Sequence, residues 1–159
     1  MNEEFTFFWK DKDPFSQWHK AGFTIDGVHF KTAEHYMMYK KAELFKDEEA
    51  MKGVLECKHP REVKAWGRRV KNFDSVTWDA HKIHIVYEGN KAKFEQNPHC
   101  YEALEKTVGT TLVEASPYDR VWGIGLEETD DRAHNRSTWR GENLLGVVLT
   151  DLRINMIGK

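Results

Sequence analysis

The sequence predicts a mainly α-helical protein: a multihelical single domain with one small β-hairpin and a few short strands. The 159 residues match the usual size of one domain, and apolar residues recur at helical spacing over much of the chain. Asp26-Gly27, between two short β-favouring runs, is typical of a tight hairpin turn. We therefore expect one domain over residues 1–159, with no linker, internal repeat or low-complexity segment.

The first elements follow from local signals. Residues 1–21 are rich in aromatic side chains but hold no helical or strand period, so no regular element is expected there. The hairpin is expected over residues 23–30, because its turn needs a positive φ at both central residues. Thr32 is expected to cap a helix over 33–45, since its hydroxyl can accept a backbone N–H of the first turn.

Two short helices should come next. Residues 47–57 predict one, and Pro60 suits the first turn of the other, where its missing N–H costs nothing. The apolar side of this third helix is expected to comprise Val63, Trp66, Val70 and Phe73.

The second half predicts a long helix from about Trp78 to Gln96, a short one after Pro98, and a strand over 110–116. The final segment, 142–156, predicts an amphipathic helix from its apolar spacing. Residues 126–141 are polar, and the sequence leaves open whether they form a mobile lid or a surface insertion.

Composition excludes several classes of protein. Hydrophobic residues make up 40% of the chain and charged residues 31%, a balance typical of soluble globular proteins. The net charge of -2 excludes a dominant polyanion-binding surface but not a local basic pocket. Two distant cysteines, Cys57 and Cys100, predict a reduced, cytoplasmic protein. No apolar run approaches ~20 residues, and the N-terminus is acidic, so neither a membrane span nor a secretory signal is expected.

Glu34 and Lys41 form the first candidate constellation. They lie seven residues apart on one predicted helix, which is nearly two turns, so both point to the same side. Glu34 is in the first turn, where the helix dipole favours a carboxylate that could act as a base, a nucleophile or a stabiliser of positive charge. The alternative is a solvated ion pair near a helix start.

A second constellation lies in ASPYDRVWGIG, residues 115–125. Asp119 and Trp122 could line a sugar site, because carboxylates bind hydroxyls and indoles cover apolar faces. An aspartate-capped turn beside a core tryptophan explains the same residues equally well.

Other chemistry is weakly indicated or excluded. The run 60–70 carries Arg68 among four basic residues, which could bind a phosphate but more simply form a solvated face. His81 and His84 give at most two metal ligands, and no HExxH or Cys/His cluster accompanies them. GxSxG, phosphate-loop and GxGxxG motifs are absent from the sequence.

Five segments carry a combined pattern: FSQWHKAGFTIDGVHFKTAEHYMMYKKA, KAWGRR, KFEQNP, EASPYDRVWGIG and GENLLGVVLTDLR. Together and in this order they resemble the NADAR (NAD- and ADP-ribose-associated) family, also called YbiA-like, over nearly the whole chain. The resemblance implies a multihelical fold and N-glycosidase activity. Its substrates would be ribosylated bases or amines, such as phosphoribosylamino-pyrimidine riboflavin intermediates or ADP-ribosyl-guanine.

The resemblance also implies site residues. Glu34 of AEHY, Lys41 and Asp119 of SPxDxxWG are the expected catalytic residues. The expected substrate-binding residues are Trp78, Trp122, Asn143, Arg68, Phe15 and Ser16. The family's usual Ser-Asn-Phe is Ser16-Gln17-Trp18 here, and MMYKK replaces a glutamine-rich helix segment, so pocket shape and substrate preference are expected to differ.

In this interpretation no metal or organic cofactor is needed. The partner is a small ribosylated molecule that carries a ribose phosphate or ADP-ribose moiety, and nucleic acid enters only as ADP-ribosylated guanine. No membrane is involved, and homo-oligomerisation is left open. Two other classes stay open: a non-catalytic ADP-ribose- or nucleotide-binding module, and an interaction protein that retains the fold.

Overall fold

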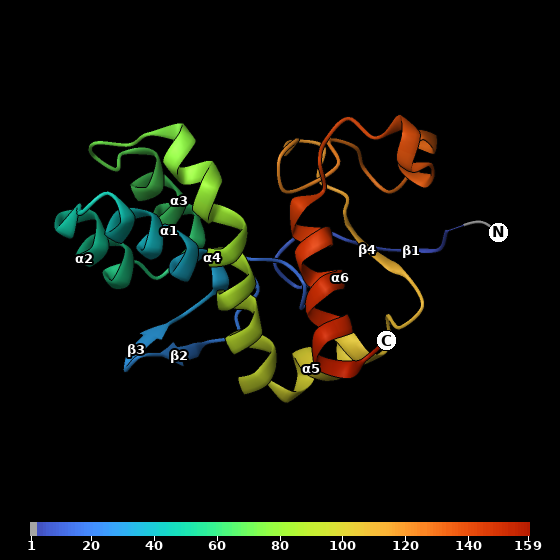
Figure 1. Cartoon of the computed structure of the whole chain (residues 1–159), viewed down its shortest axis with the longest axis horizontal. Helices are drawn as coiled ribbons and strands as arrows, with labels where there is room; N and C mark the ends of the chain where they lie inside the picture. The colour runs from blue at the N-terminus through green and yellow to red at the C-terminus, as the bar shows by residue number, and fades with distance from the viewer. Residues whose placement is uncertain (1–2) are drawn as a thin grey trace. The chain divides into compact units, whose positions relative to one another are not determined.

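The computed structural model describes residues 3–159, and the chain forms two compact units (Figure 1). The first unit joins the segment ending at Ser16 to Pro98–Lys159, and the second is Gln17–Asn97. Helices dominate the elements of the chain, which confirms the mainly α-helical class. Within residues 3–159, no helix is both long and apolar enough to cross a membrane. The division into one domain over 1–159 stays a prediction.

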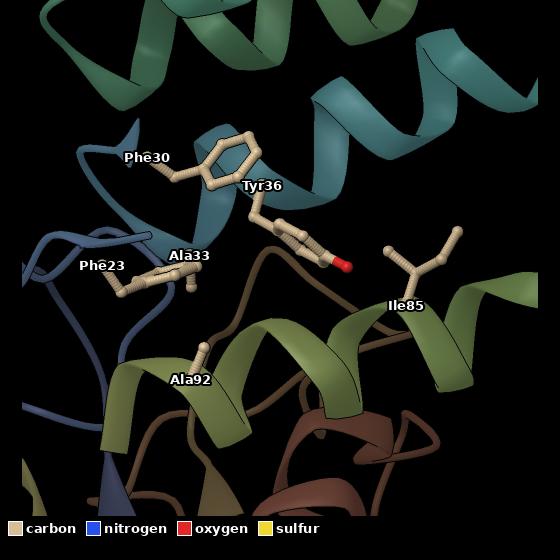
Figure 2. Packing of buried hydrophobic residues seen from close by; sticks show 6 residues of the cluster. All are labelled: Phe23, Phe30, Ala33, Tyr36, Ile85 and Ala92. Atoms are coloured by element: carbon tan, nitrogen blue, oxygen red, sulfur yellow. The ribbon is translucent and has the colours of Figure 1, made fainter. Parts of the chain in front are cut away.

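The predicted hairpin is confirmed in the second unit. Strands β2 (Phe23–Ile25) and β3 (Val28–Phe30) pair antiparallel, with Phe23 opposite Phe30. Asp26 has φ 50° and Gly27 has φ 81°, so both central turn residues are left-handed, as a type I′ turn requires. Figure 2 shows the result: the hairpin phenylalanines pack with side chains from two helices, namely Ala33, Tyr36, Ile85 and Ala92.

Helix α1 (Ala33–Leu44) is the central element of this unit. It packs against α2 (Glu48–Glu56), α3 (Pro60–Arg68) and α4 (Ser75–Gln96). Pro60 occupies the first turn of α3, as expected.

Two boundaries differ from the sequence prediction. Helix α4 begins at Ser75 rather than at Trp78, because the Asp74 carboxylate accepts the Thr77 N–H at 3.1 Å and caps the helix there. Helix α3 ends at Arg68, so Phe73 lies beyond it and is 46% exposed. The prediction that Phe73 belongs to the apolar side of that helix was therefore wrong.

The start of α1 is held by a closed network of hydrogen bonds. The Thr32 hydroxyl accepts the backbone N–H of His35 at 3.2 Å and lies 2.7 Å from Nδ1 of its ring. The other ring nitrogen, Nε2, is 2.9 Å from the carbonyl oxygen of Cys57. Because a carbonyl only accepts, Nε2 carries the proton and Nδ1 accepts the Thr32 hydroxyl. The predicted Thr32 cap is thus confirmed and extended by a neutral, buried histidine.

The first unit contains a strand that the sequence did not indicate. Strand β1 (Phe5–Phe8) pairs in parallel with β4 (Thr111–Glu114), with Phe5 opposite Thr111. The expectation of no regular element over 1–21 was wrong here. FTFF is too short to show an alternation, and its partner lies more than a hundred residues away along the chain.

Side chains of α6 (Leu144–Ile157) and of Asn143 before it form hydrogen bonds with backbone groups of β4 that β1 leaves unpaired. The Asn143 side chain accepts the Glu114 N–H at 2.9 Å and donates to the Leu112 carbonyl at 3.0 Å. The Thr150 hydroxyl accepts the Leu112 N–H at 3.0 Å. A Cβ atom on Gly146 would overlap the Leu112 carbonyl oxygen, so only glycine allows this close approach of α6 to the strand. Helix α5 (Pro98–Glu105) also contacts α6.

The polar stretch 126–141 is packed on β1. It contains two short 3₁₀ helices, η1 (Asp131–His134) and η2 (Arg136–Thr138). The Trp139 indole donates to the Ala133 carbonyl at 2.8 Å, and its ring centroid lies 5.3 Å from that of Phe5. These contacts favour an ordered surface insertion over a mobile lid.

The close contact at Gly146 generates a stability prediction. In an ordinary helix, glycine-to-alanine substitution stabilises by about 1 kcal/mol. Gly146→Ala should instead lower the free energy of unfolding by about 1–3 kcal/mol, because the new methyl group displaces α6 from β4. Urea denaturation followed by circular dichroism measures this, with Val147→Ala, 40% exposed on the same helix, as the control. A stabilised Gly146→Ala variant would contradict the packing described above.

The network at His35 predicts a pH dependence. Burial lowers the pKa of His35 in the folded chain, and the charge of Lys31 also lowers it, whereas the hydrogen bond to Cys57 raises it. The unfolded chain therefore binds more protons below the ordinary pKa of about 6.5. The stability contributed by neutral His35 should be complete above this pH and lost as the pH falls through the lowered folded pKa.

Urea midpoints measured across this pH range should fall less steeply for His35→Gln than for the unsubstituted chain. His84→Gln, at an exposed position of α4, provides the matched control and should keep the original pH dependence. Parallel curves for all three proteins would show that His35 does not cause the loss.

Candidate functional site

Glu34 is a buried carboxylate at the start of α1. Its residue is 5% exposed, and its backbone N–H donates to the Gln17 carbonyl at 3.0 Å. The dipole of a helix places partial positive charge at its start, which favours a nearby negative charge. The position of Glu34 therefore stabilises its ionised form while burial keeps most of its surface from bulk water.

Lys41 follows on the same helix in an aromatic environment. Its Nζ lies 4.6 Å from the ring centroid of Phe73 and 5.6 Å from that of Trp78. Burial lowers the pKa of Lys41, and the negative charge of Glu34 acts in the opposite direction. The two charges are thus electrostatically coupled, and the ammonium is partly removed from water.

Trp78 and Phe73 form the wall beside Lys41. Trp78 is half-buried in the first turns of α4 and packs against the hydrophobic clusters on both sides of α1. Phe73 packs its edge on Phe45, with ring centroids 5.3 Å apart. Helical spacing placed Phe73 on the apolar side of α3, so no pattern in the sequence indicated that it lies beside Lys41.

Arg68 lies exposed at the end of α3, next to a glycine that packs closely against α1. A Cβ atom on Gly67 would overlap the sulfur of Met38, so glycine lets α3 approach the α1 segment between Glu34 and Lys41. Arg68 itself is solvated, and its predicted phosphate contact stays a prediction.

Gln17, where the family usually has asparagine, connects three segments of the second unit. Its side-chain amide exchanges hydrogen bonds with buried Asn90 on α4, at 3.0 and 3.3 Å. Its carbonyl accepts the Glu34 N–H. Trp18, the second departure, packs its ring edge to face with His59 at 5.7 Å between centroids. Gln17 thus contacts the helix start that carries Glu34 through its backbone carbonyl, and Trp18 packs at the start of α3.

In the first unit, Asp119 stabilises a turn. Its Oδ1 atom accepts the N–H groups of Val121 and Trp122 at 2.9 and 2.8 Å. The aspartate-capped turn expected as an alternative is thus present. The turn fixes the orientation of the carboxylate, and the role of Asp119 in catalysis stays a prediction.

Trp122 and Asn143 lie where this turn meets α6. The Leu144 and Leu145 N–H groups donate to the Val121 and Trp122 carbonyls, both at 3.1 Å. These bonds occupy two backbone N–H groups at the start of α6. Asn143 is fully buried and holds β4 with its side chain, so the structure gives it a positioning role.

Phe15 and Ser16 are buried in a turn of the same unit. Phe15 packs on Phe8, with ring centroids 5.6 Å apart. Asp13 orders the turn through both its side chain and its carbonyl oxygen, which accept the N–H groups of Phe15 and Ser16 at 3.2 and 3.0 Å. The predicted site residues therefore form two groups, one in each unit: Glu34, Lys41 and Trp78, and Asp119, Trp122 and Asn143. Their convergence on one cleft stays a prediction.

A hollow of about 740 Å³ lies elsewhere in the first unit, at the beginning of β4. Residues 108–111 and the α6 side chains Thr150, Arg153 and Ile154 contribute to its lining. It contains none of the predicted site residues. The turn of Asp119 instead follows the carboxyl end of β4.

Comparison with known proteins agrees with these motifs. The NADAR domain family matches residues 7–157. An N-glycosidase of Acanthamoeba polyphaga mimivirus is 46% identical over 146 residues, which are 87% of this chain and 85% of that protein. An N-glycosidase of Nostoc punctiforme is 30% identical, with 91% of this chain and 86% of that protein aligned.

The solved NMR structure of Escherichia coli YbiA has the same fold. It aligns with a TM-score of 0.78 and 26% sequence identity, over 98% of this chain and 86% of YbiA. The matched family spans both units of the chain, including the segments that carry AEHY and SPxDxxWG. The family resemblance inferred from the sequence is confirmed, and the chain belongs to the NADAR family.

Proposed function

We propose that this chain is an N-glycosidase that hydrolyses the N-glycosidic bond of a ribosylated base or amine. The observation that carries the proposal is the buried Glu34 carboxylate at the start of α1, coupled to Lys41 beside two aromatic rings. The names of the mimivirus and Nostoc relatives support the reaction class.

The chemistry needs a fixed negative charge. Cleavage of an N-glycosidic bond develops positive charge on the sugar, in an oxocarbenium-like transition state. Glu34 stabilises this charge directly or takes a proton from the attacking water. A carboxylate already oriented by the helix needs little reorganisation when the charge develops.

Lys41 has two available roles. As an ammonium it polarises the departing base. As a neutral amine, which its lowered pKa favours, it attacks the anomeric carbon of the ribose, and the base departs with the proton that the amine loses; the resulting glycosylamine opens its sugar ring to an imine. Water then hydrolyses this imine and returns the amine and the free sugar.

The remaining residues are assigned to substrate binding. Trp78 and Trp122 cover the base or exclude water, Asp119 binds ribose hydroxyls, and Arg68 holds phosphate oxygens at the solvated end of α3. Asn143, Phe15 and Ser16 shape their part of the site through the backbone that they hold. Water is the only co-reactant of this hydrolysis.

Two substrate classes fit the reaction. A maize protein named as a riboflavin biosynthesis protein is 35% identical over 134 residues, although these are only 20% of its length. This relative favours phosphoribosylamino-pyrimidine intermediates as the substrates. The second class is ADP-ribosylated guanine, as the free nucleoside or in nucleic acid.

A turnover assay distinguishes an enzyme from a non-catalytic binding module. The purified chain should release free base or amine from a ribosylaminopyrimidine phosphate or from ADP-ribosylated guanosine, as measured by chromatography. Binding without product would indicate a non-catalytic module. Neither binding nor product would indicate a protein that acts through its surface.

Removal of the Glu34 charge tests its role. Glu34→Gln keeps the shape of the side chain, so folding and substrate binding should stay nearly unchanged. The turnover rate should fall by ~10²–10³-fold, because the transition state loses its stabilising charge. Glu43→Gln, on an exposed position of the same helix, is the control and should retain full activity. A fully active Glu34→Gln variant would remove Glu34 from the catalytic residues.

Lys41 distinguishes imine formation from electrostatic assistance. If the amine is a nucleophile, borohydride should trap a covalent adduct at Lys41 during turnover, detectable by peptide mass spectrometry. Lys41→Arg should then abolish trapping and activity, because arginine keeps the charge but forms no imine. If Lys41 only supplies charge, no adduct should form and Lys41→Arg should keep partial activity. Lys40→Arg, one position earlier, is the matched control, and unaltered kinetics in Lys41→Ala would contradict both roles.

A further inference from the structure

Aromatic rings hold the amine of Lys41 in place. Its Nζ lies 4.6 Å from the ring centroid of Phe73 and 5.6 Å from that of Trp78. Within residues 3–159, this amine forms no salt bridge and no hydrogen bond. Both roles proposed for Lys41 need Nζ at a defined point, so the elements that place the two rings bear on the reaction. Trp78 is placed by α4, whereas Phe73 belongs to no helix or strand.

The loop of residues 69–74 carries Phe73. It follows α3 and ends at Asp74, which caps α4. Val70 anchors the loop, because its side chain is buried in a hydrophobic cluster with residues of α1 and α2. Asn72 has φ 61°, a left-handed conformation that asparagine adopts more readily than most residues, so the chain turns directly before Phe73. The geometry of the loop therefore limits where the Phe73 ring can lie.

The buried carboxylate of Asp47 ties this loop to α1 and α2. Its Oδ1 atom accepts the Ala50 N–H at 3.1 Å and caps α2, while Oδ2 accepts the Lys71 N–H at 2.9 Å. The Asp47 N–H in turn donates to the Ala42 carbonyl of α1 at 2.9 Å. The bond from Lys71 is the largest of the causes that lower the pKa of Asp47, so it favours the charged carboxylate. One side chain thus fixes the loop two residues before Phe73.

The Phe73 ring reaches both the solvent and the amine of Lys41. The residue is 46% exposed, and its ring contacts that of Phe45 with planes inclined by 75°. Burial is the largest influence on the pKa of Lys41 and lowers it, whereas the charge of Glu34 raises it. A ring centred 4.6 Å from Nζ contributes to this burial, because it occupies space that water would otherwise fill.

We propose that Phe73 is a positioning residue for Lys41 and that Asp47 sets its place. The loop bonded to Asp47 holds the Phe73 ring against Nζ and keeps bulk water from one side of the amine. This inference rests on the proposed function, because it assigns to these two residues the orientation of a catalytic side chain. In this role neither residue needs to touch the substrate: the carboxylate acts on the loop, the loop on the ring and the ring on the amine.

Trace acetylation measures the state of Lys41 without any substrate. The purified chain is labelled with a small amount of acetic anhydride across a pH series, and peptide mass spectrometry gives the rate at each lysine. Only the free amine reacts, so the midpoint of each rate profile reports the pKa of that lysine. Lys40, which pairs with Glu43 on the same helix, is the internal reference and should keep one profile in every variant.

Phe73→Ala opens Nζ to water. Because burial is the larger influence on the pKa of Lys41, the midpoint of its labelling profile should move upward, toward the ordinary value of 10.5. The turnover rate on a ribosylaminopyrimidine phosphate should fall by about 10-fold or more, since misplacing a reacting group can cost ~10²-fold. Phe73→Tyr keeps the ring face and should restore both readouts. Val76→Ala, 75% exposed in the first turn of α4, is the matched control and should change neither.

Asp47→Asn tests the anchor of the loop. Asparagine has one side-chain oxygen, so it can still cap α2 through the Ala50 N–H, but its amide nitrogen cannot accept the Lys71 N–H. The labelling profile of Lys41 and the turnover rate should change in the same direction as in Phe73→Ala, by a smaller factor. Glu48→Gln removes the neighbouring, exposed carboxylate and should leave both readouts unchanged. Equal effects in the two variants would show a general effect of charge and overturn the role of Asp47.

The two readouts keep this inference separate from the glycosidase function. If Lys41 keeps its original labelling profile in Phe73→Ala, or if the profile shifts without a loss of turnover, Phe73 is not a positioning residue. Either result leaves the N-glycosidase activity of the original chain in place. Conversely, a shifted profile in a chain that cleaves no ribosylated substrate keeps the coupling of Phe73 to Lys41 and overturns the proposed glycosidase function.

Discussion

The hydrogen-bond network at the start of α1 is the constraint on which the second unit depends. A helix start exposes N–H groups that need acceptors, and burying it is costly unless these are supplied. Thr32 and the Gln17 carbonyl supply them, while His35 ties the same turn to Cys57 after α2. Glu34 lies buried in this turn, and its own backbone N–H is one of the groups so satisfied. The role proposed for Glu34 thus depends on an ordinary helix-capping interaction, which fixes the turn that carries it.

The short sheet of the first unit also has backbone groups that need hydrogen-bond partners. A two-stranded sheet leaves one edge of each strand without a neighbouring strand, and such edges need other hydrogen-bond partners. On β4 these partners are the side chains of Asn143 and Thr150, which bond the backbone as a third strand would do. The same asparagine begins α6 with a φ of 54°, so one residue turns the chain and closes the sheet. This gives Asn143 of the GENLLG segment a structural role, and its predicted role in substrate binding stays a prediction.

Local signals in the sequence predicted most of the helices and the hairpin, because caps, prolines and Asp-Gly turns act within a few residues. They could not predict β1, since its partner is remote, or the exposed position of Phe73, since helical spacing continues past the true end of α3. For the site, spacing on α1 predicted that Glu34 and Lys41 share a face, and their electrostatic coupling agrees. The aromatic surroundings of Lys41 depend on how α4 and the preceding loop pack against α1, which no local pattern encodes.

The parallel pairing of β1 with β4 also orders events during synthesis. The second unit, Gln17–Asn97, is contiguous in the sequence, so all of its residues are synthesised before β4 appears. β1 emerges earlier but waits about a hundred residues for β4, which takes roughly 5 to 20 seconds at usual translation rates. During this interval β1, with the sequence FTFF, has no partner strand. Before β4 is synthesised, the unpaired β1 strand can therefore associate with a wrong partner. Chaperones that shield apolar segments would act during this interval.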